Sequence, residues 1–126
     1  MEKHFVTYNQ SLALKELGFD EPCCGVFYLI PETKKWEPYR IMEESNHNKS
    51  NFSISRPLKS QVFEWFRKYR LSVVIHDLRD DYEANIIEWT LDDDKISYGF
   101  LQLFETYEEA ESACIDKLIE LIKQKL

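Results

Sequence analysis

A long helical pattern toward the carboxyl end of the chain constrains the fold most strongly. Thr106 and Glu109 have the spacing of a capping box, in which each side chain satisfies a backbone N–H group at the start of a helix. The apolar residues that follow form one stripe at helical spacing: Ala110, Cys114, Leu118, Leu121 and Ile122, widened by Ile115, Ile119 and Leu126. A stripe of this width is typical of a helix that lies across a sheet, so the pattern predicts an α+β fold.

Three short apolar segments ahead of this helix have the composition of β-strands, and acidic links join them. The segments cover residues 71–76, 82–90 and 96–104, and the links cover residues 77–81 and 91–95. They predict a three-stranded antiparallel meander. Before the meander, Pro57 can open an amphipathic helix that ends near Arg70, because the missing N–H group of proline would be unpaired in the first helical turn.

The first part of the chain predicts a short helix and a hairpin. Thr7 and Gln10 form a second capping box, and Gly18 can end the helix because glycine adopts the left-handed conformation at little cost. Residues 25–30 and 36–41 are β-rich and flank a turn-forming segment. Residues 43–51 contain nothing apolar, so they predict the most mobile loop of the chain.

Together these elements predict a single α+β domain over residues 1–126, in the order α-β-β-α-β-β-β-α. An antiparallel sheet, made of the N-terminal hairpin and the three-stranded meander, packs against amphipathic helices in this fold. The length suits one domain, and 44% hydrophobic residues are enough to build a core. The predicted meander carries apolar residues on both faces, so we expect the N-terminal region or a second copy of the chain to cover the face opposite the helix.

Charge is distributed unevenly along the chain, and this supplies the candidate binding residues. Residues 77–94 contain eight acidic residues and one arginine, a local charge of −7 that equals the formal net charge of the whole protein. The aspartates on the predicted turns are the candidate partner-binding residues: Asp77, Asp80, Asp81, Asp92, Asp93 and Asp94. Two interpretations stay open, because acidic turns can bind another protein or can keep a small domain soluble. We predict a protein partner, with a homodimer as a second option.

A basic set precedes the meander and supports an alternative function. It consists of Arg56, Lys59, Arg67, Lys68 and Arg70. The order helix, strand, strand, strand, helix over residues 58–126 resembles that of a double-stranded-RNA-binding domain, and the alanine spacing from Tyr107 to Cys114 is similar to the last helix of that family. The resemblance implies a nucleic-acid-binding module that uses the basic helix 56–70. However, this chain carries Glu108, Glu109 and Glu111 where that family has lysines, and acidic side chains repel a polyanion.

The sequence motifs give no support for an enzyme. The chain has three glycines, so neither a dinucleotide-binding fingerprint nor a P-loop is present. Cys23, Cys24 and Cys114 are an odd number of cysteines and predict free thiols, and His47 is expected to be a solvated loop residue. We therefore predict a non-enzymatic protein without cofactor or metal. In the rival interpretation as an enzyme, the clustered candidates for acid–base chemistry are His76, Asp77 and Asp80.

The chain also shows no apolar run suited to a secretory signal or a membrane span, so a cytoplasmic location without membrane binding is expected. Three segments resemble a known group: residues 7–23 (TYNQSLALKELGFDEPC), 62–69 (VFEWFRKY), and 107–111 (YEEAE) with Leu118 and Ile119. They are similar to short uncharacterised proteins of bacteriophages and of mobile elements of Bacteroidetes-type bacteria. The resemblance implies a small cytoplasmic accessory protein of phage or prophage origin, and it transfers no activity, cofactor or catalytic residue.

Overall fold

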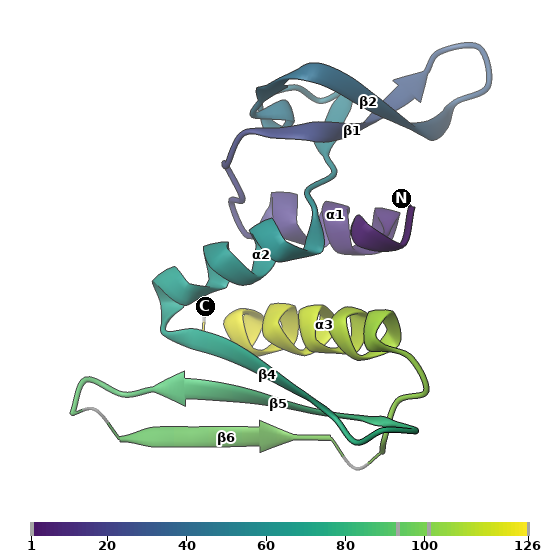
Figure 1. Cartoon of the computed structure of the whole chain (residues 1–126). Coiled ribbons are helices and arrows are strands. Elements are labelled where there is room, and N and C mark those ends of the chain that lie inside the picture. Colours follow the sequence, from purple (N-terminus) through teal and green to yellow (C-terminus); the bar gives the residue numbers. More distant parts are fainter. Residues whose placement is uncertain (1, 93, 101, 126) are drawn as a thin grey trace. The chain divides into compact units, whose positions relative to one another are not determined.

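The computed structural model describes residues 2–92, 94–100 and 102–125, and the chain divides into two compact units. We call Met1–Leu58 the N-terminal unit and Lys59–Leu126 the C-terminal unit. Each unit holds its own three-stranded antiparallel sheet, and helices occur in both, so the predicted α+β class is confirmed (Figure 1). The prediction of one sheet made of the hairpin and the meander is wrong: the hairpin pairs with a third short strand in one sheet, and the meander forms the other. That the two units act as one domain stays a prediction.

The N-terminal unit begins with a short 3₁₀ turn, followed by a helix that the sequence predicted well. Both hydrogen bonds of the capping box are present: the Gln10 N–H donates to Thr7 Oγ1 (3.2 Å), and the Thr7 N–H donates to Gln10 Oε1 (3.0 Å). Gly18, just beyond the helix, has a φ of 90°, as expected for its role at the helix end. The elements are η1 (Glu2–His4), α1 (Tyr8–Glu16), β1 (Cys23–Ile30), β2 (Lys35–Ser45), η2 (His47–Lys49) and β3 (Ser53–Ser55), with strand order β2-β1-β3.

The segment predicted as a mobile loop is instead ordered by hydrogen bonds. β2 continues to Ser45, and η2 follows it directly. The Asn48 side chain donates to the Phe19 carbonyl and accepts the Ser55 N–H, both at 2.8 Å, and so connects the end of α1 to the edge of β3. β3 itself was not predicted, because its three residues give too short a pattern to recognise.

Gly25 of β1 allows two backbone segments of this unit to come very close. The Arg56 N–H donates to the Gly25 carbonyl at 2.9 Å. A Cβ atom added to Gly25 would lie 2.1 Å from the Arg56 carbonyl oxygen and 3.0 Å from a ring carbon of Phe5. Only glycine fits here without moving the main chain.

The C-terminal unit has the predicted element order. Arg70 takes the left-handed conformation (φ 63°) after a 3₁₀ turn, so the second helical segment ends where the sequence indicated. The predicted last strand is shorter than expected, since Phe104 forms only an isolated bridge with Tyr82. The elements are α2 (Lys59–Phe66), η3 (Arg67–Tyr69), β4 (Leu71–Asp77), β5 (Tyr82–Trp89), β6 (Lys95–Gly99) and α3 (Tyr107–Lys125), with strand order β4-β5-β6.

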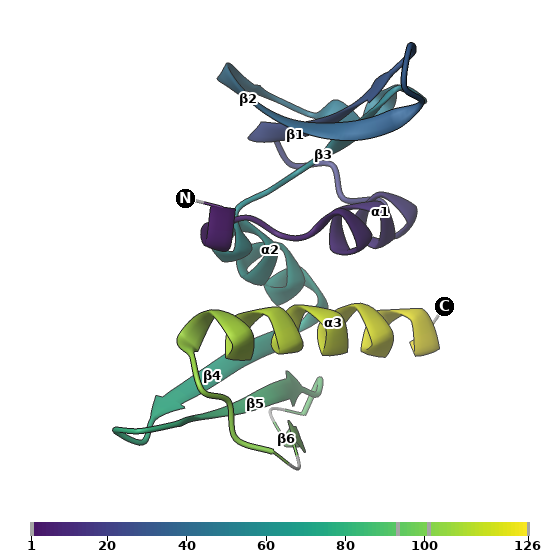
Figure 2. The same ribbon diagram turned by 90° about the vertical axis from the view of Figure 1, so that its right-hand side faces the viewer.

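The core of the C-terminal unit lies between its sheet and α3. Figures 1 and 2 show α3 on one side of β4, β5 and β6. The buried residues Ala84, Phe104, Ala110 and Cys114 form a cluster against which Val73 and Ile75 pack. Val73 and Ile75 lie opposite Ile86 and Ala84 on β5, and directly opposed residues of an antiparallel pair point to the same face. This face of the sheet, which we call the inner face, is therefore the one that α3 covers.

Among the helices of the described part of the chain, none has both the length and the apolar composition needed to cross a membrane.

Candidate functional site

The first acidic turn joins β4 to β5 and carries three of the candidate partner-binding residues. Asp77 and Asp80 are exposed, and Asp81 is half-buried. The Leu78 N–H donates to the Asp81 carbonyl (2.9 Å), and the Arg79 N–H donates to Asp77 Oδ1 (2.8 Å). These bonds define the path of the turn and leave the Asp80 carboxylate at the surface.

The second acidic turn joins β5 to β6. Asp92 and Asp94 are exposed there, and Asp93, the third aspartate predicted for this turn, lies outside the described residues. The Thr90 N–H and hydroxyl both donate to the Asp94 carbonyl, at 2.8 Å and 3.1 Å. Thr90 thus closes the turn through main-chain contacts without using the Asp94 carboxylate.

The meander places these two acidic turns at opposite ends of the sheet (Figure 1). They are separated by the eight residues of β5, which span about 25 Å at roughly 3.3 Å per residue. The run of acids in the sequence is therefore two acidic surfaces in the structure, and one small ligand cannot contact both. Each turn also displays an exposed leucine beside its aspartates: Leu78 is 47% exposed and Leu91 is 83% exposed.

The structure divides the predicted basic set between the two units. Arg56 belongs to the N-terminal unit, where it is 6% exposed and its guanidinium lies over the rings of Phe5 (4.7 Å) and Phe27 (5.2 Å). Lys59 is also buried, and its Nζ donates to the Glu108 carbonyl at 3.3 Å. These two cations therefore do not belong to an exposed basic surface.

The remaining three basic residues are exposed and close together in the chain. Arg67 and Lys68 lie on η3, and Arg70 follows it. The Arg70 side chain donates to the Thr90 carbonyl at 3.2 Å, so it also supports the second acidic turn. Arg67 lines a small hollow of about 160 Å³ with Phe63 and Tyr107. A nucleic acid would meet a patch of three cations, which is smaller than the set that the sequence predicted.

A pocket that the sequence did not predict lies on the sheet of the N-terminal unit. β1 and β2 pair regularly up to Gly25 and Arg40, and pair again at Cys23 and Ser45. One residue of β1 therefore lies opposite four of β2, and this irregularity opens a cavity of about 480 Å³. The cavity is lined by Cys24, Arg40, Ile41, Met42 and Glu44.

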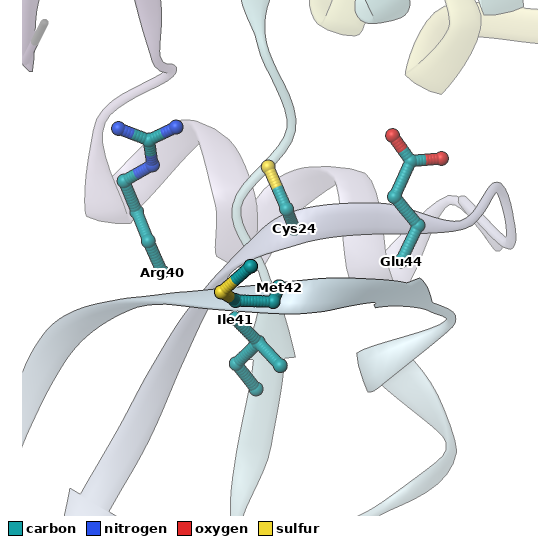
Figure 3. A pocket seen from close by; sticks show the side chains of 5 residues that line it. All are labelled: Cys24, Arg40, Ile41, Met42 and Glu44. Carbon is teal, nitrogen blue, oxygen red and sulfur yellow. The ribbon is translucent and has the colours of Figure 1, made fainter.

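Figure 3 shows that Cys24, Arg40 and Glu44 point to the same side of the strands, and Ile41 to the other side. A thiol, a guanidinium and a carboxylate thus share one rim. The adjacent cysteines were the only signal of this place in the sequence, and the strand irregularity that opens it depends on pairing that a sequence does not show. The described cysteines Cys23, Cys24 and Cys114 are free thiols, as predicted.

The prediction of a solvated His47 is wrong. His47 is 9% exposed, its Nε2 donates to the Cys23 carbonyl (3.1 Å), and its backbone N–H donates to Ser55 Oγ (2.9 Å). Ser45 Oγ lies 3.4 Å from His47 Nδ1 and 3.3 Å from Nε2. Because the hydroxyl is about equally far from both ring nitrogens, it is not aligned with one of them, unlike a nucleophile hydrogen-bonded to its base.

The acid–base candidates of the second unit do not converge either. His76 lies opposite Glu83, on the face of the sheet away from α3, and Asp77 is its neighbour along β4. Neighbouring residues of a strand point to opposite faces, so the His76 and Asp77 side chains diverge. Asp80 lies in the turn beyond them.

Burial controls the chemistry of two of the thiols. Burial, together with the nearby Glu111 carboxylate, raises the pKa of Cys114 to about 12. Burial also raises the pKa of Cys23, against the opposing effect of its hydrogen bond with Ser55. Neither thiol is therefore activated as a nucleophile, since the reactive form is the thiolate.

One ionic contact anchors the end of α3 to the sheet. Lys125 donates to the Glu88 carboxylate, which also accepts the Tyr98 hydroxyl at 2.8 Å. These two hydrogen bonds, that of Lys125 first, lower the pKa of Glu88. The hydrogen bond to the Glu88 carboxylate raises the pKa of Tyr98.

Within residues 2–92, 94–100 and 102–125, no three His, Cys, Asp or Glu side chains gather in a group able to hold a metal ion. Comparison of the chain with protein-family models, with curated proteins and with solved structures found no match. The function must therefore be argued from the surfaces described above.

Proposed function

We propose that this protein is a small, non-enzymatic accessory module that binds another protein through the two acidic turns of its C-terminal unit. One observation carries the proposal: each acidic turn presents an exposed leucine next to exposed aspartates. Solubility requires charge at the surface, but it does not require Leu78 and Leu91 in water. Protein interfaces, in contrast, combine apolar contact with charged groups at the rim.

The resemblance to short phage and mobile-element proteins implies a small accessory protein, and the proposed function is in keeping with it. The hydrogen bonds inside both turns add to this support. A surface whose main-chain path is already defined loses less conformational entropy when it binds.

A pull-down from cells of the host type tests the proposal. The turn variant carries Asp80→Asn, Asp81→Asn, Asp92→Asn and Asp94→Asn; Asp77 is kept because it caps its own turn. The matched control carries Glu32→Gln, Glu37→Gln, Glu43→Gln and Glu44→Gln, four exposed acids of the N-terminal unit, and so has the same net charge. We expect the same protein to be recovered with the wild type and the control and to be lost with the turn variant. Equal recovery by both variants would show that the turns are not the binding surface.

Titration with duplex and single-stranded nucleic acid separates the alternative function. Binding that weakens steeply with salt, and that is lost when Arg67, Lys68 and Arg70 are replaced by glutamine, would favour a nucleic-acid-binding module over the proposed one.

A further inference from the structure

The sheet of the C-terminal unit has a second face, opposite α3, which we call the outer face. Among the described residues of this unit, no helix lies over it (Figures 1 and 2). The strand register assigns its residues, since they alternate with the inner-face residues along each strand. They are Ser72, Val74 and His76 on β4, Glu83, Asn85, Ile87 and Trp89 on β5, and Lys95, Ser97 and Gly99 on β6.

Three neighbouring apolar residues on β4 and β5 form a row on this outer face, which we call the apolar diagonal. It runs through Val74, Ile87 and Trp89, of which Trp89 is 42% exposed and the other two are half-buried. Ile87 lies between Ser72 on one neighbouring strand and Ser97 on the other. Small hydroxyl side chains on both sides leave the isoleucine accessible to a larger side chain from outside. The outer face therefore has an apolar centre, as the inner face does, but fewer apolar side chains surround it.

Ser97 and Gly99 keep part of the β6 side of the outer face flat, and the exposed Lys95 stands at its end, opposite Trp89. Gly99 lies opposite Asn85, and a Cβ at Gly99 would come within 3.0 Å of Asn85 Oδ1. The Asn85 side chain, which also donates to Glu83 Oε1 at 3.4 Å, thus lies in the space that a larger residue at position 99 would fill. A flat surface with an apolar diagonal suits a helix, because a helix packs against a sheet in this way on the inner face.

The charge around the outer face indicates the charge of a helix that could bind there. The acidic turns stand at its two ends, about 25 Å apart along β5. A helix of about 16 residues, rising 1.5 Å per residue, reaches from one turn to the other. A second copy of this chain is a poor occupant, because acidic residues outnumber basic ones at both ends of the face, even with Arg79 at one end and Arg70 and Lys95 at the other. Either orientation of the copy would place carboxylates against carboxylates.

We propose that the outer face docks a basic amphipathic helix of another protein. Its apolar side chains contact Val74, Ile87 and Trp89, and its lysine or arginine side chains at both ends lie near the two acidic turns. This inference rests on the proposed function and adds to it the surface that is used and the chemistry of the partner.

The probe is a synthetic peptide of about 16 residues, made of leucine and lysine at helical spacing with lysines at both ends and no tryptophan. A control peptide carries glutamate in place of every lysine. Titration of the ¹⁵N-labelled protein, followed by NMR, is expected to shift the amide signals of Ser72, Ile87 and Ser97 with the basic peptide and to leave them unchanged with the acidic peptide.

Two variants test the two parts of the surface. Ile87→Ser removes the centre of the diagonal and should weaken peptide binding about tenfold, as expected for the loss of one buried aliphatic side chain. Asp80→Lys combined with Asp92→Lys reverses one charge at each end and should weaken binding by at least about tenfold. The matched control, Glu32→Lys with Glu43→Lys, should bind like the wild type. If Ile87→Ser does not give a dispersed NMR spectrum, Ile87→Thr, which stays β-branched, takes its place.

Three results would overturn the inference: the basic peptide does not bind at millimolar concentration, all variants bind it with equal affinity, or the amide signals that shift all belong to the N-terminal unit. A dimer of the wild type that dissociates in Ile87→Ser would show that a second copy occupies the face. In the pull-down described above, a partner lost with the turn variant but kept with Ile87→Ser would refute the outer face alone, whereas a partner kept with the turn variant would refute the proposed function.

Discussion

The contact at Gly25 gives the sharpest prediction about stability. An alanine at this position places its Cβ 2.1 Å from the Arg56 carbonyl oxygen, whereas carbon and oxygen atoms normally approach to about 3.3 Å. The main chain must therefore move by about 1 Å, since a backbone oxygen cannot rotate away as the tip of a side chain can. The movement strains the 2.9 Å hydrogen bond from Arg56 to Gly25 and the packing of the Arg56 guanidinium on Phe5 and Phe27.

The expected cost follows from these contacts. Overpacking of a buried site typically costs about 1–3 kcal/mol, and the loss of a buried hydrogen bond adds about 1 kcal/mol. Gly25→Ala should thus destabilise the N-terminal unit by about 3 kcal/mol, which lowers its melting temperature by about 10 °C or more for a unit of this size. Native-state hydrogen exchange measures the free energy of opening in each unit by itself: at the Val26 and Phe27 amides, and at the Ile86 amide as the reference in the other unit.

Gly99→Ala is the matched control for this substitution. Its added Cβ meets a flexible atom, Asn85 Oδ1, at 3.0 Å, so a change of the Asn85 rotamer relieves the contact and the cost should stay below about 1 kcal/mol. If Gly25→Ala proved no more destabilising than Gly99→Ala, the close approach of Arg56 to β1 would be wrong.

Three further outcomes follow from single groups. Because burial raises the folded-state pKa of Cys114 to about 12, the stability that its neutral thiol contributes is fully present below pH 9 and is lost as the pH rises toward 12. By pH 11 the loss should reach about 3 kcal/mol and be absent in Cys114→Ala, as urea unfolding between pH 8 and 11 would show. The lowered pKa of Glu88 makes stability depend on pH in the acidic range. The contact of Glu88 with Lys125 stabilises the fold above the ordinary glutamate pKa and weakens as the pH falls below it. In thermal unfolding between pH 6 and 3, the wild type should therefore lose up to about 1 kcal/mol more stability than Glu88→Gln. Asn48→Ala should cost about 1–3 kcal/mol and speed hydrogen exchange at the Ser55 amide, whereas alanine at the exposed Asn51 should change neither.

The elements that the sequence predicted correctly are those defined by local signals. The Thr7 capping box, Gly18 beyond the first helix and Arg70 at the end of η3 all depend on residues within one or two turns of each other. Such signals are visible in a sequence because the interacting groups are neighbours in it.

The errors have a common cause, which is contact between residues far apart in the chain. Residues 43–51 have the composition of a mobile loop, yet Asn48 bonds to Phe19 and Ser55, and His47 bonds to Cys23. Polar side chains that favour loops also make such bonds, so composition alone could not separate the two outcomes. The cavity beside Cys24 has the same origin, since it depends on the pairing of β1 with β2.

The acidic residues show how topology changes the meaning of a sequence pattern. Along the chain they form one cluster, but the strand β5, about 25 Å long, separates the turn that carries Asp80 from the turn that carries Asp92. At physiological salt the electrostatic screening length is about 8 Å, so the two turns act on a ligand as two separate charges. A compact basic ligand therefore gains from one turn only, whereas an elongated one gains from both and must also cross the apolar diagonal that lies between them. In the docking that we propose, the meander thus turns a simple excess of acid into a surface that would select its partner by length as well as by charge.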